Sequence, residues 1–153
     1  RKPLNHLEYY RLPWNYPDNG ISWLEPTMIG FDNDGTPHLR IEHRVIASGP
    51  SITDNVANIA FFYGLVHYYA SHATPAEHRL EFAQARDNFY TAAKHGLNGK
   101  INWINCERCN IRNLILNTLL EQAEDGLQSL QIDQKDINYY LGIIRQRTEQ
   151  QQT

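Results

Sequence analysis

One stretch constrains the fold of this chain more than any other, because charged side chains occupy every second position of it. It runs His38-Leu39-Arg40-Ile41-Glu42-His43-Arg44-Val45-Ile46. Successive side chains of a β-strand point to opposite faces. Leu39, Ile41, His43 and Val45 therefore share one face, and Arg40, Glu42 and Arg44 share the other. The pattern predicts a strand with one face in a core and a cation, a carboxylate and a cation in a row on its other face.

A turn signal just before this stretch predicts that the strand belongs to an antiparallel hairpin. The run Asp32-Asn33-Asp34-Gly35 is typical of a tight turn, and its glycine can take the positive φ that such turns require. Residues 28–31 lead into the turn, so we expect a hairpin within residues 21–46. Residues 1–19 are rich in proline and tyrosine and are expected to be irregular.

The remaining residues show the apolar spacing of helices. A first helix is expected after Gly49-Pro50-Ser51, with Ser51 or Thr53 as its cap. Asn58 and His67 interrupt its apolar stripe, and we expect both to be satisfied polar residues of a core. The stripe is wide and aromatic, which predicts a well-buried helix, and it contains Ile52, Val56, Ile59, Phe62, Tyr63, Val66 and Tyr69.

Three more helices are expected farther along the chain. One opens at Thr74-Pro75 and stops at Gly96, another runs from about Asn110 to Leu130, and a last one is capped by Asp133. The polar end of the last helix, residues 145–153, is expected to fray. Residues 101–104 form an edge strand or a packed loop. The inner face of the helix that opens at residue 74 is predicted to hold Leu80, Phe82, Ala85, Phe89, Ala92 and Ala93.

Together these elements predict an α+β fold. Antiparallel strands or a hairpin in the first third are followed by about four helices that pack on one face of the sheet. Residues 1–48 hold the irregular segment and the strands, and residues 49–153 the helices, in a single domain or fragment. The 153 residues suffice for one domain. Because the chain begins Arg1-Lys2-Pro3 without methionine, we expect it to be a piece of a longer protein.

Composition excludes several classes of protein. A net charge of −3 is too balanced for a basic nucleic-acid module, so no nucleic-acid partner is expected. No apolar run approaches the roughly 20 residues of a membrane helix, so no membrane partner is expected either. A single C-x-x-C, Cys106 to Cys109, lacks the four ligands of a structural zinc site. We expect two ordinary reduced thiols, which suit a cytoplasmic protein.

Two interpretations of the charged strand face remain open on the residues alone. In one, Arg40, Glu42 and Arg44 are solvated and neutralise one another, as on many half-exposed antiparallel sheets. In the other, the face binds phosphate and a metal ion. A carboxylate is a hard oxygen ligand for Mg²⁺, and flanking arginines bind phosphate or carboxylate oxygens bidentately. Phosphoryl transfer needs this mixture, because negative charge must be neutralised as it moves.

At this strand the chain resembles a known family, the bacterial glutamate–cysteine ligase-like carboxylate–amine ligases. The resemblance is carried by Leu39-Arg40-Ile41-Glu42-His43-Arg44-Val45, by Gly49-Pro50-Ser51 and by Val56-Ala57-Asn58-Ile59-Ala60-Phe61-Phe62. It continues through residues 81–97 and more weakly at residues 140–144, so that it covers roughly residues 20–147. The family shares the glutamine synthetase catalytic fold, and the resemblance implies that this chain is the C-terminal part of such a catalytic domain.

The resemblance also implies an activity and a site. These enzymes form amide bonds with ATP and Mg²⁺: a carboxylate attacks the γ-phosphate, and an amine then displaces phosphate from the acyl phosphate. Carried onto the R-I-E-x-R motif of this chain, Glu42 is the Mg²⁺ ligand and Arg40 lies near the ATP phosphates. Arg44 contacts the reacting carboxylate or the transferring phosphoryl group. The implied partners are small molecules, an amino acid or other carboxylate and an amine. Related enzymes tend to self-associate, so a homo-oligomer is also expected.

The chain departs from the family pattern in two places. Family members carry an upstream segment similar to W-R-W-N-R, whereas Ile21-Ser22-Trp23-Leu24-Glu25-Pro26-Thr27 has no arginine. The E-x-E motif, the other metal-binding element of the superfamily, occurs nowhere in this chain. We therefore expect a fragment that contributes part of the Mg-ATP site and is inactive alone. The alternative is a non-catalytic interaction domain that retains the ligase fold.

Overall fold

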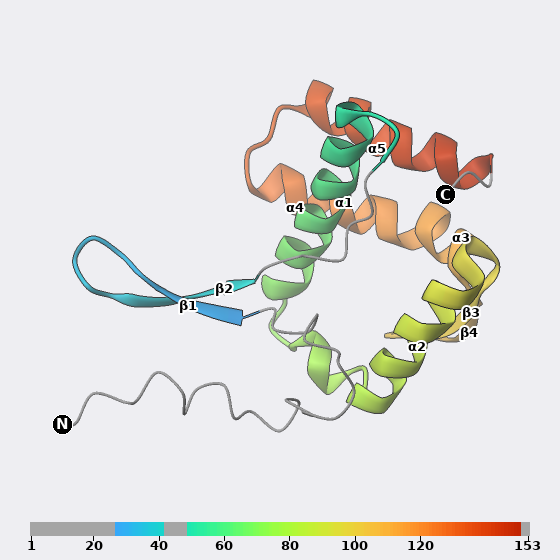
Figure 1. Cartoon of the computed structure of the whole chain (residues 1–153), viewed down its shortest axis with the longest axis horizontal. Helices are drawn as coiled ribbons and strands as arrows, with labels where there is room; N and C mark the ends of the chain where they lie inside the picture. The colour runs from blue at the N-terminus through green and yellow to red at the C-terminus, as the bar shows by residue number, and fades with distance from the viewer. Residues whose placement is uncertain (1–26, 42–48, 151–153) are drawn as a thin grey trace. The chain divides into compact units, whose positions relative to one another are not determined.

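The computed structural model describes residues 27–41 and 49–150. The chain divides into two compact units between Ala47 and Ser48, and each is treated by itself. In the first unit, β1 (Thr27–Phe31) pairs antiparallel with β2 (Pro37–Ile41), as Figure 1 shows. The second unit contains the helices and a further pair of strands. Among the described residues, no helix is long and apolar enough to cross a membrane.

The turn between β1 and β2 is the predicted one. The Asp32 amide donates to the Thr36 carbonyl at 2.9 Å, and the Gly35 amide donates to the Asp32 carbonyl at 2.9 Å. Gly35 has a φ of 85°, which a residue with a Cβ rarely adopts. The Asp34 carboxylate also accepts a hydrogen bond from the Thr36 amide at 3.0 Å. Residues 27–41 thus form an antiparallel strand pair joined by this turn.

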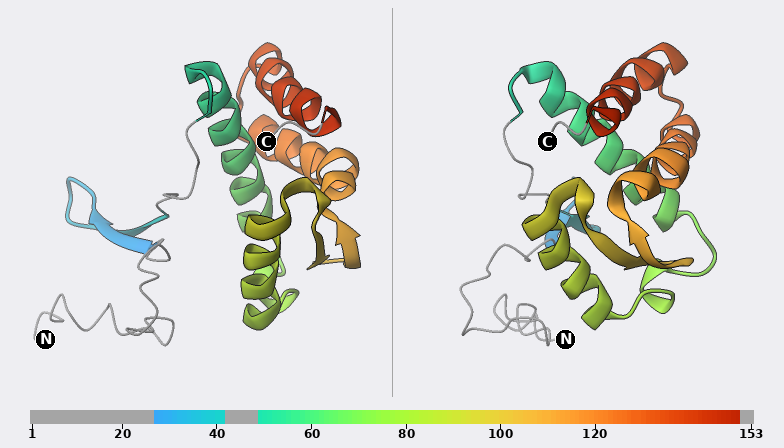
Figure 2. Two further views of the ribbon diagram at one scale, coloured as in Figure 1. Left: turned by 45° about the vertical axis from the view of Figure 1, so that its right-hand side comes forward. Right: turned by 90° about the vertical axis from the view of Figure 1, so that its right-hand side faces the viewer.

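The second unit is built mainly from helices. The α3, π-helical η4 and α4 segments follow one another without a break, so that residues 111–129 form one helical rod. Figure 2 shows this rod beside α1 and α5. In chain order the elements are α1 (Ile52–Ala70), η2 (Ala76–His78), α2 (Phe82–His95), η3 (Gly96–Asn98), β3 (Lys100–Trp103), β4 (Cys106–Asn110), α3 (Ile111–Leu114), η4 (Ile115–Leu119), α4 (Leu120–Ser129) and α5 (Gln134–Glu149).

The core of this unit lies where α1, α4 and α5 meet. Small residues allow α1 and α4 to approach closely, since Ala57 and Ala123 are fully buried and Gly64 contacts the α4 backbone. Larger apolar side chains from α4 and α5 fill the remaining space. Both helices lie in the segments predicted to be helical after residue 110. The buried cluster consists of Ala57, Leu120, Ala123, Leu127, Ile137, Leu141 and Ile144.

The predicted fold class is wrong. The described chain is mostly helical, and its helices pack on one another. The predicted glutamine synthetase-like catalytic domain would instead have its helices packed on one face of a sheet. Within the helical unit, the strand pair β3–β4 comes after the first two helices, near residues 100–110. The physical reason is that the facing small residues of α1 and α4 let the helices bury their apolar surface against each other.

The burial predicted for the first two helices is also wrong. Ile52 of α1 is 82% exposed and Tyr63 is 59% exposed, although both belong to the expected buried stripe. On α2, Phe82 is 59% exposed and Phe89 is 44% exposed, and no residue of that helix is buried. The face of α1 that packs is the narrower one that carries Ala57 and Gly64. The spacing of the apolar residues predicted both helices correctly, but it did not predict which face of each helix is buried.

The segment from α2 to the β3–β4 hairpin is held by polar contacts. The Asn88 side chain of α2 pairs with the backbone of Asn102 in β3: its oxygen accepts from the Asn102 amide at 3.0 Å, and its nitrogen donates to the Asn102 carbonyl. The Asn102 side chain in turn accepts from the Arg108 amide at 3.0 Å. Of the two alternatives for residues 101–104, the strand is correct.

Candidate functional site

The structure describes only one residue of the predicted ligase site. Arg40 lies on β2, where its Cα is paired with that of Met28 across the hairpin. Glu42 and Arg44 lie outside the described residues. The donor set itself fits Mg-ATP in kind, because it offers one hard carboxylate for Mg²⁺ and two guanidinium groups for phosphate oxygens.

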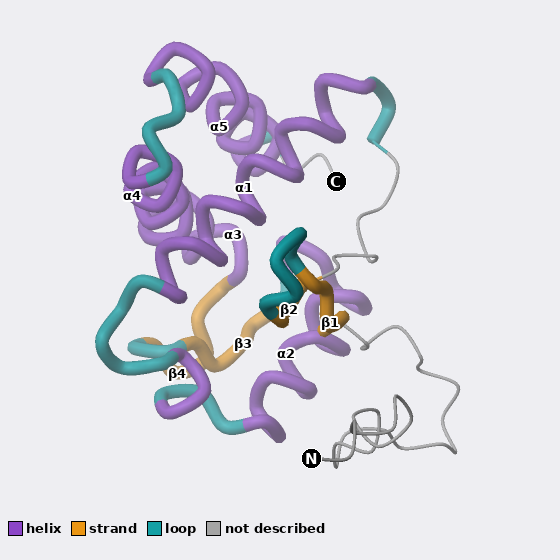
Figure 3. The backbone as a smooth tube through the Cα atoms, turned by 90° about the vertical axis from the view of Figure 1, so that its left-hand side faces the viewer, coloured by secondary structure: helices purple, strands orange, loops and turns teal. Residues whose placement is uncertain are grey.

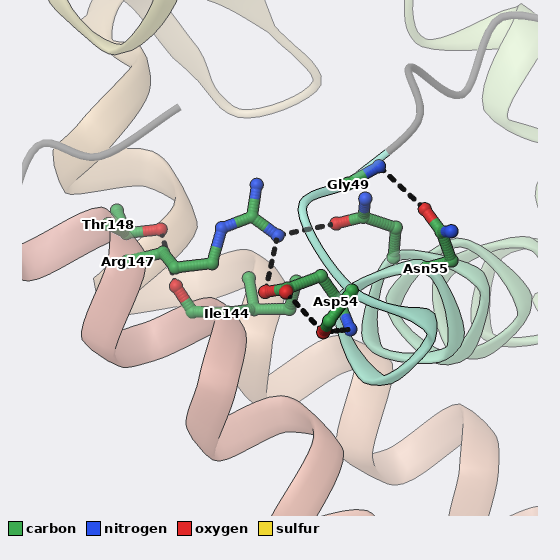
Figure 4. Close-up of polar contacts among 8 residues, drawn as sticks. Gly49, Asp54, Asn55, Ile144, Arg147 and Thr148 are labelled. Atoms are coloured by element: carbon green, nitrogen blue, oxygen red, sulfur yellow. Dashed lines mark hydrogen bonds and ion pairs between the residues drawn. The ribbon is translucent and has the colours of Figure 1, made fainter.

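The described chain resumes at Gly49 with a polar cluster at the start of α1, which we define as Gly49, Ser51, Asp54, Asn55, Asn58 and Arg147 (Figure 4). Ser51 is the N-cap, as one of the two predicted alternatives requires. Its hydroxyl accepts from the Asp54 amide at 3.2 Å and donates to the Asp54 carboxylate at 2.6 Å. The Gly49 amide donates to the Asn55 side chain at 2.7 Å. The chain is therefore fixed directly after residues 42–48.

Arg147 joins this cluster from the far end of the sequence. Its Nη1 donates to the Asn58 side chain at 3.1 Å and lies 3.7 Å from an oxygen of Asp54. The side chains of Arg147 and Asp54 are 24% and 17% exposed, so the ion pair is partly shielded from water. Asn58 is thus a satisfied polar residue, as predicted. His67 is satisfied as well, because its Nδ1 lies 2.8 Å from the Ser129 hydroxyl oxygen.

Sequence reasoning missed Arg147, because residues 145–153 were expected to fray. In the structure α5 continues to Glu149, and Thr148 is only 4% exposed. Arg112 caps the end of α5 by donating to the carbonyls of Thr148 and Glu149, at 3.1 and 2.6 Å. The signal was present, since Arg147 and Thr148 extend the inward spacing of Ile137, Leu141 and Ile144 by one more turn.

The cysteines differ from the prediction. Cys106 and Cys109 form a disulfide within β4, with their Cα atoms 5.9 Å apart, and are not two reduced thiols. Arg108, between them, has a φ of 52°, and this left-handed residue brings the two cysteines together. No group of three or more His, Cys, Asp or Glu side chains that could hold a metal ion is found in the described part of the chain.

Comparisons of the chain with protein-family models, with curated proteins and with solved structures give no match. The assignment of a function therefore depends on the residues of the chain and on their contacts. Two features bear on it directly: the R-I-E-x-R motif that begins on β2, and the polar cluster that follows it.

Proposed function

We propose that this chain is part of an ATP-dependent carboxylate–amine ligase of the glutamate–cysteine ligase type. In this proposal it contributes part of the Mg-ATP and carboxylate site and is inactive alone. The observation that carries the proposal is the motif Arg40-Ile41-Glu42-His43-Arg44, whose first residues lie on an antiparallel strand. On such a strand alternate residues share a face at a spacing of about 6.6–7 Å. That spacing suits one carboxylate between two guanidinium groups along a polyphosphate.

Each charged residue has a separate role in the proposal. Glu42 holds Mg²⁺, and the ion neutralises phosphate charge when bound. Arg40 binds the phosphate oxygens of ATP. Arg44 orients the reacting carboxylate or the transferring phosphoryl oxygens by paired N–H donors. With both arginines in place, the charge that develops during transfer meets fixed positive groups.

The polar cluster at the start of α1 supports the proposal as a positioning element. It follows Arg44 by a few residues, and its Gly49–Asn55 hydrogen bond fixes the backbone where the chain enters the helix. Asn58, part of the family-like stretch Val56–Phe62, holds Arg147 of α5. The cluster thereby holds the start of α1 against the end of α5, as an ordered element that is next in sequence to the motif.

The proposal is tested by assaying Mg-ATP turnover in the isolated chain and in the longer protein expected to contain it. We expect no ADP release from the isolated chain, because the E-x-E metal ligands are missing from it. In the longer protein, Arg44→Gln should lower amide formation at least about a hundredfold, as loss of a group that stabilises transferred charge does. Arg145→Gln, an exposed arginine of α5, is the control and should leave the rate unchanged. Clear ATP turnover by the isolated chain would overturn the proposal.

A second candidate function is a non-catalytic interaction module. The exposure of large apolar side chains favours it, since Ile52, Tyr63 and Phe82 are each more than half exposed. Exposed apolar surface of this kind often marks a contact with another protein, including a second copy of the chain. Sedimentation of the purified chain tests this candidate. A monomer at high concentration, together with ATP turnover by the longer protein, would exclude it in favour of the ligase.

A further inference from the structure

We propose that the second unit holds a binding site for a small carboxylate with an aromatic or apolar body, built from residues other than Arg40, Glu42 and Arg44. The site is a cavity of about 280 Å³ between the last turns of α1, the β3–β4 hairpin and the helical rod of residues 111–129. We call it the tyrosine cavity, after Tyr68 and Tyr69. Figure 3 shows α1 running from beside α5 toward the β3–β4 hairpin.

Its walls are fixed by a hydrogen-bond network around Tyr69. The Tyr69 hydroxyl accepts from the Trp103 indole nitrogen at 3.1 Å and donates to the Gln122 side-chain oxygen at 2.6 Å. The Tyr69 and Trp103 rings meet edge to face with centroids 6.2 Å apart. This network joins α1, β3 and α4, so the aromatic walls are formed before any ligand arrives. Partial burial raises the pKa of Tyr69, which keeps its hydroxyl protonated and able to donate.

The polar groups that line the cavity are donors with capacity left over. The side-chain oxygen of Gln122 accepts the hydrogen bond from Tyr69, and the side-chain nitrogen of Gln122 has no acceptor among the described residues. One terminal nitrogen of Arg79 donates to the Asn105 side chain at 2.7 Å, and the described residues supply no ion-pair partner for its charge. His72 is not one of these donors: its Nδ1 lies 2.7 Å from the Tyr68 carbonyl oxygen, which can only accept, so the Nδ1 proton is already used.

Charge and size define the ligand class. The residues that line the cavity include no aspartate or glutamate, whereas Arg79 brings a full positive charge. Guanidinium and amide N–H groups bind carboxylate oxygens by charge-assisted hydrogen bonds, and the faces of Tyr68 and Trp103 suit an aromatic or apolar body. The volume of about 280 Å³ lies just below the roughly 300 Å³ at which sites for drug-sized molecules begin. A ligand about the size of an amino acid therefore fits.

The helical rod provides an independent indication that this is a functional site. Thr118 lines the cavity from η4, the π-helical segment Ile115–Leu119. Such segments are rare, and they occur frequently where a helix is locally rearranged to serve a binding or catalytic site. The π-helical turn changes the register of the rod between Leu114 and Gln122. Both residues also line the cavity.

Calorimetric titration with benzoate tests the proposal. We expect saturable binding of benzoate and binding of the neutral isostere benzyl alcohol that is at least about tenfold weaker, because only the carboxylate pairs with Arg79. Arg79→Gln should weaken benzoate binding by about tenfold or more. Arg86→Gln is the matched control: Arg86 is an exposed arginine of α2 that pairs with Asp87 outside the cavity, and its removal should leave binding unchanged.

The proposal would be overturned by the absence of saturable benzoate binding, by equal binding of benzyl alcohol, or by benzoate binding that Arg79→Gln leaves unchanged. Circular dichroism establishes that each variant is folded, and Arg79→Lys, which keeps the charge, should retain part of the affinity. A titration with inorganic phosphate distinguishes a site for aromatic carboxylates from a site for anions in general. Tighter binding of phosphate than of benzoate would contradict the assigned ligand class. None of these measurements involves ATP, so their result is independent of the proposed ligase function.

Discussion

Gly64 of α1 and Gly126 of α4 face each other where the two helices cross, so closely that neither position has room for a side chain. A Cβ built at Gly126 would collide with the carbonyl oxygen of Gly64 and lie 2.8 Å from its carbonyl carbon. A Cβ at Gly64 would collide with the carbonyl oxygen of Ala123 and lie 2.9 Å from the Ala123 Cα. The opposing atoms are backbone, which cannot turn away as a flexible side chain can.

Substitution of either glycine should therefore destabilise the helical unit. We expect Gly64→Ala and Gly126→Ala to lower the free energy of unfolding by about 2–4 kcal/mol, because the helices must move apart and lose core contacts. Gly142→Ala on α5 is the matched control. A Cβ there meets nothing within 4 Å, so helix propensity should raise stability by roughly 0.5–1 kcal/mol. Urea unfolding measures all three, and wild-type stability in Gly126→Ala would contradict the close crossing.

The Asn58–Arg147 contact should behave as one coupled pair. We expect Arg147→Ala to cost about 1–2 kcal/mol, because it removes a hydrogen bond and leaves the half-buried Asn58 without its partner. In a double-mutant cycle with Asn58→Ala, the coupling energy should be about 0.5–2 kcal/mol. Arg145→Ala, on the exposed side of the same helix, should be near neutral. Strict additivity of the Asn58 and Arg147 substitutions would show that the contact contributes nothing.

The turn of the β1–β2 hairpin should respond to acid through Asp34. Hydrogen bonds from Thr36 lower the pKa of this carboxyl below its ordinary value near 3.8. The bonds are therefore fully present above that value and are lost as the pH falls through the lower pKa of the folded turn. The Thr36 amide resonance, followed by NMR, should titrate with a midpoint below that of an unstructured aspartate. Asp34→Asn should abolish this titration, and a midpoint at or above the ordinary value would contradict the assigned hydrogen bonds.

The cysteine pair gives a direct chemical prediction. Because Cys106 and Cys109 are joined in a disulfide, the unfolded chain should take up no iodoacetamide until a reductant is added. After reduction, mass spectrometry should show two labelled cysteines. Labelling of both residues in the non-reduced chain would instead restore the sequence-based expectation of free thiols.

Local signals in the sequence predicted local structure well. Asp32 to Gly35 forms the expected turn, Ser51 caps α1, and the Asp133 side chain caps α5 by accepting from the Lys135 amide at 2.8 Å. Each of these depends on a few neighbouring residues and on backbone preferences that they carry themselves. Nothing at a distance is needed to decide them.

The long-range arrangement could not be derived in the same way. The aromatic stripe of α1 indicated a helix, but α4 packs against the small residues beside Gly64 and leaves Ile52 and Tyr63 exposed. Which face of a helix is buried depends on the shape of its partner, and a glycine gives no apolar signal. Trp103 and Gln122 were likewise separated in the sequence and meet only through Tyr69.

Of the predicted ligase site, Arg40 lies within the described residues, and Glu42 and Arg44 lie outside them. The register of β2 places Arg40 on a strand, as its alternation with Leu39 and Ile41 predicted. The roles of Arg40, Glu42 and Arg44 stay predictions that depend on the motif and on the chemistry of its side chains. The proposed Mg²⁺ binding depends on Glu42, because it is the only carboxylate of the motif.

The most direct measurement is therefore ATP-dependent amide formation by the longer protein that we propose contains this chain, with Glu42 replaced. We predict that Glu42→Ala abolishes Mg-ATP turnover, because the site loses its carboxylate ligand for Mg²⁺. Glu121→Ala, an exposed glutamate of α4, should leave the rate at the wild-type level. Near wild-type turnover in Glu42→Ala would contradict the account.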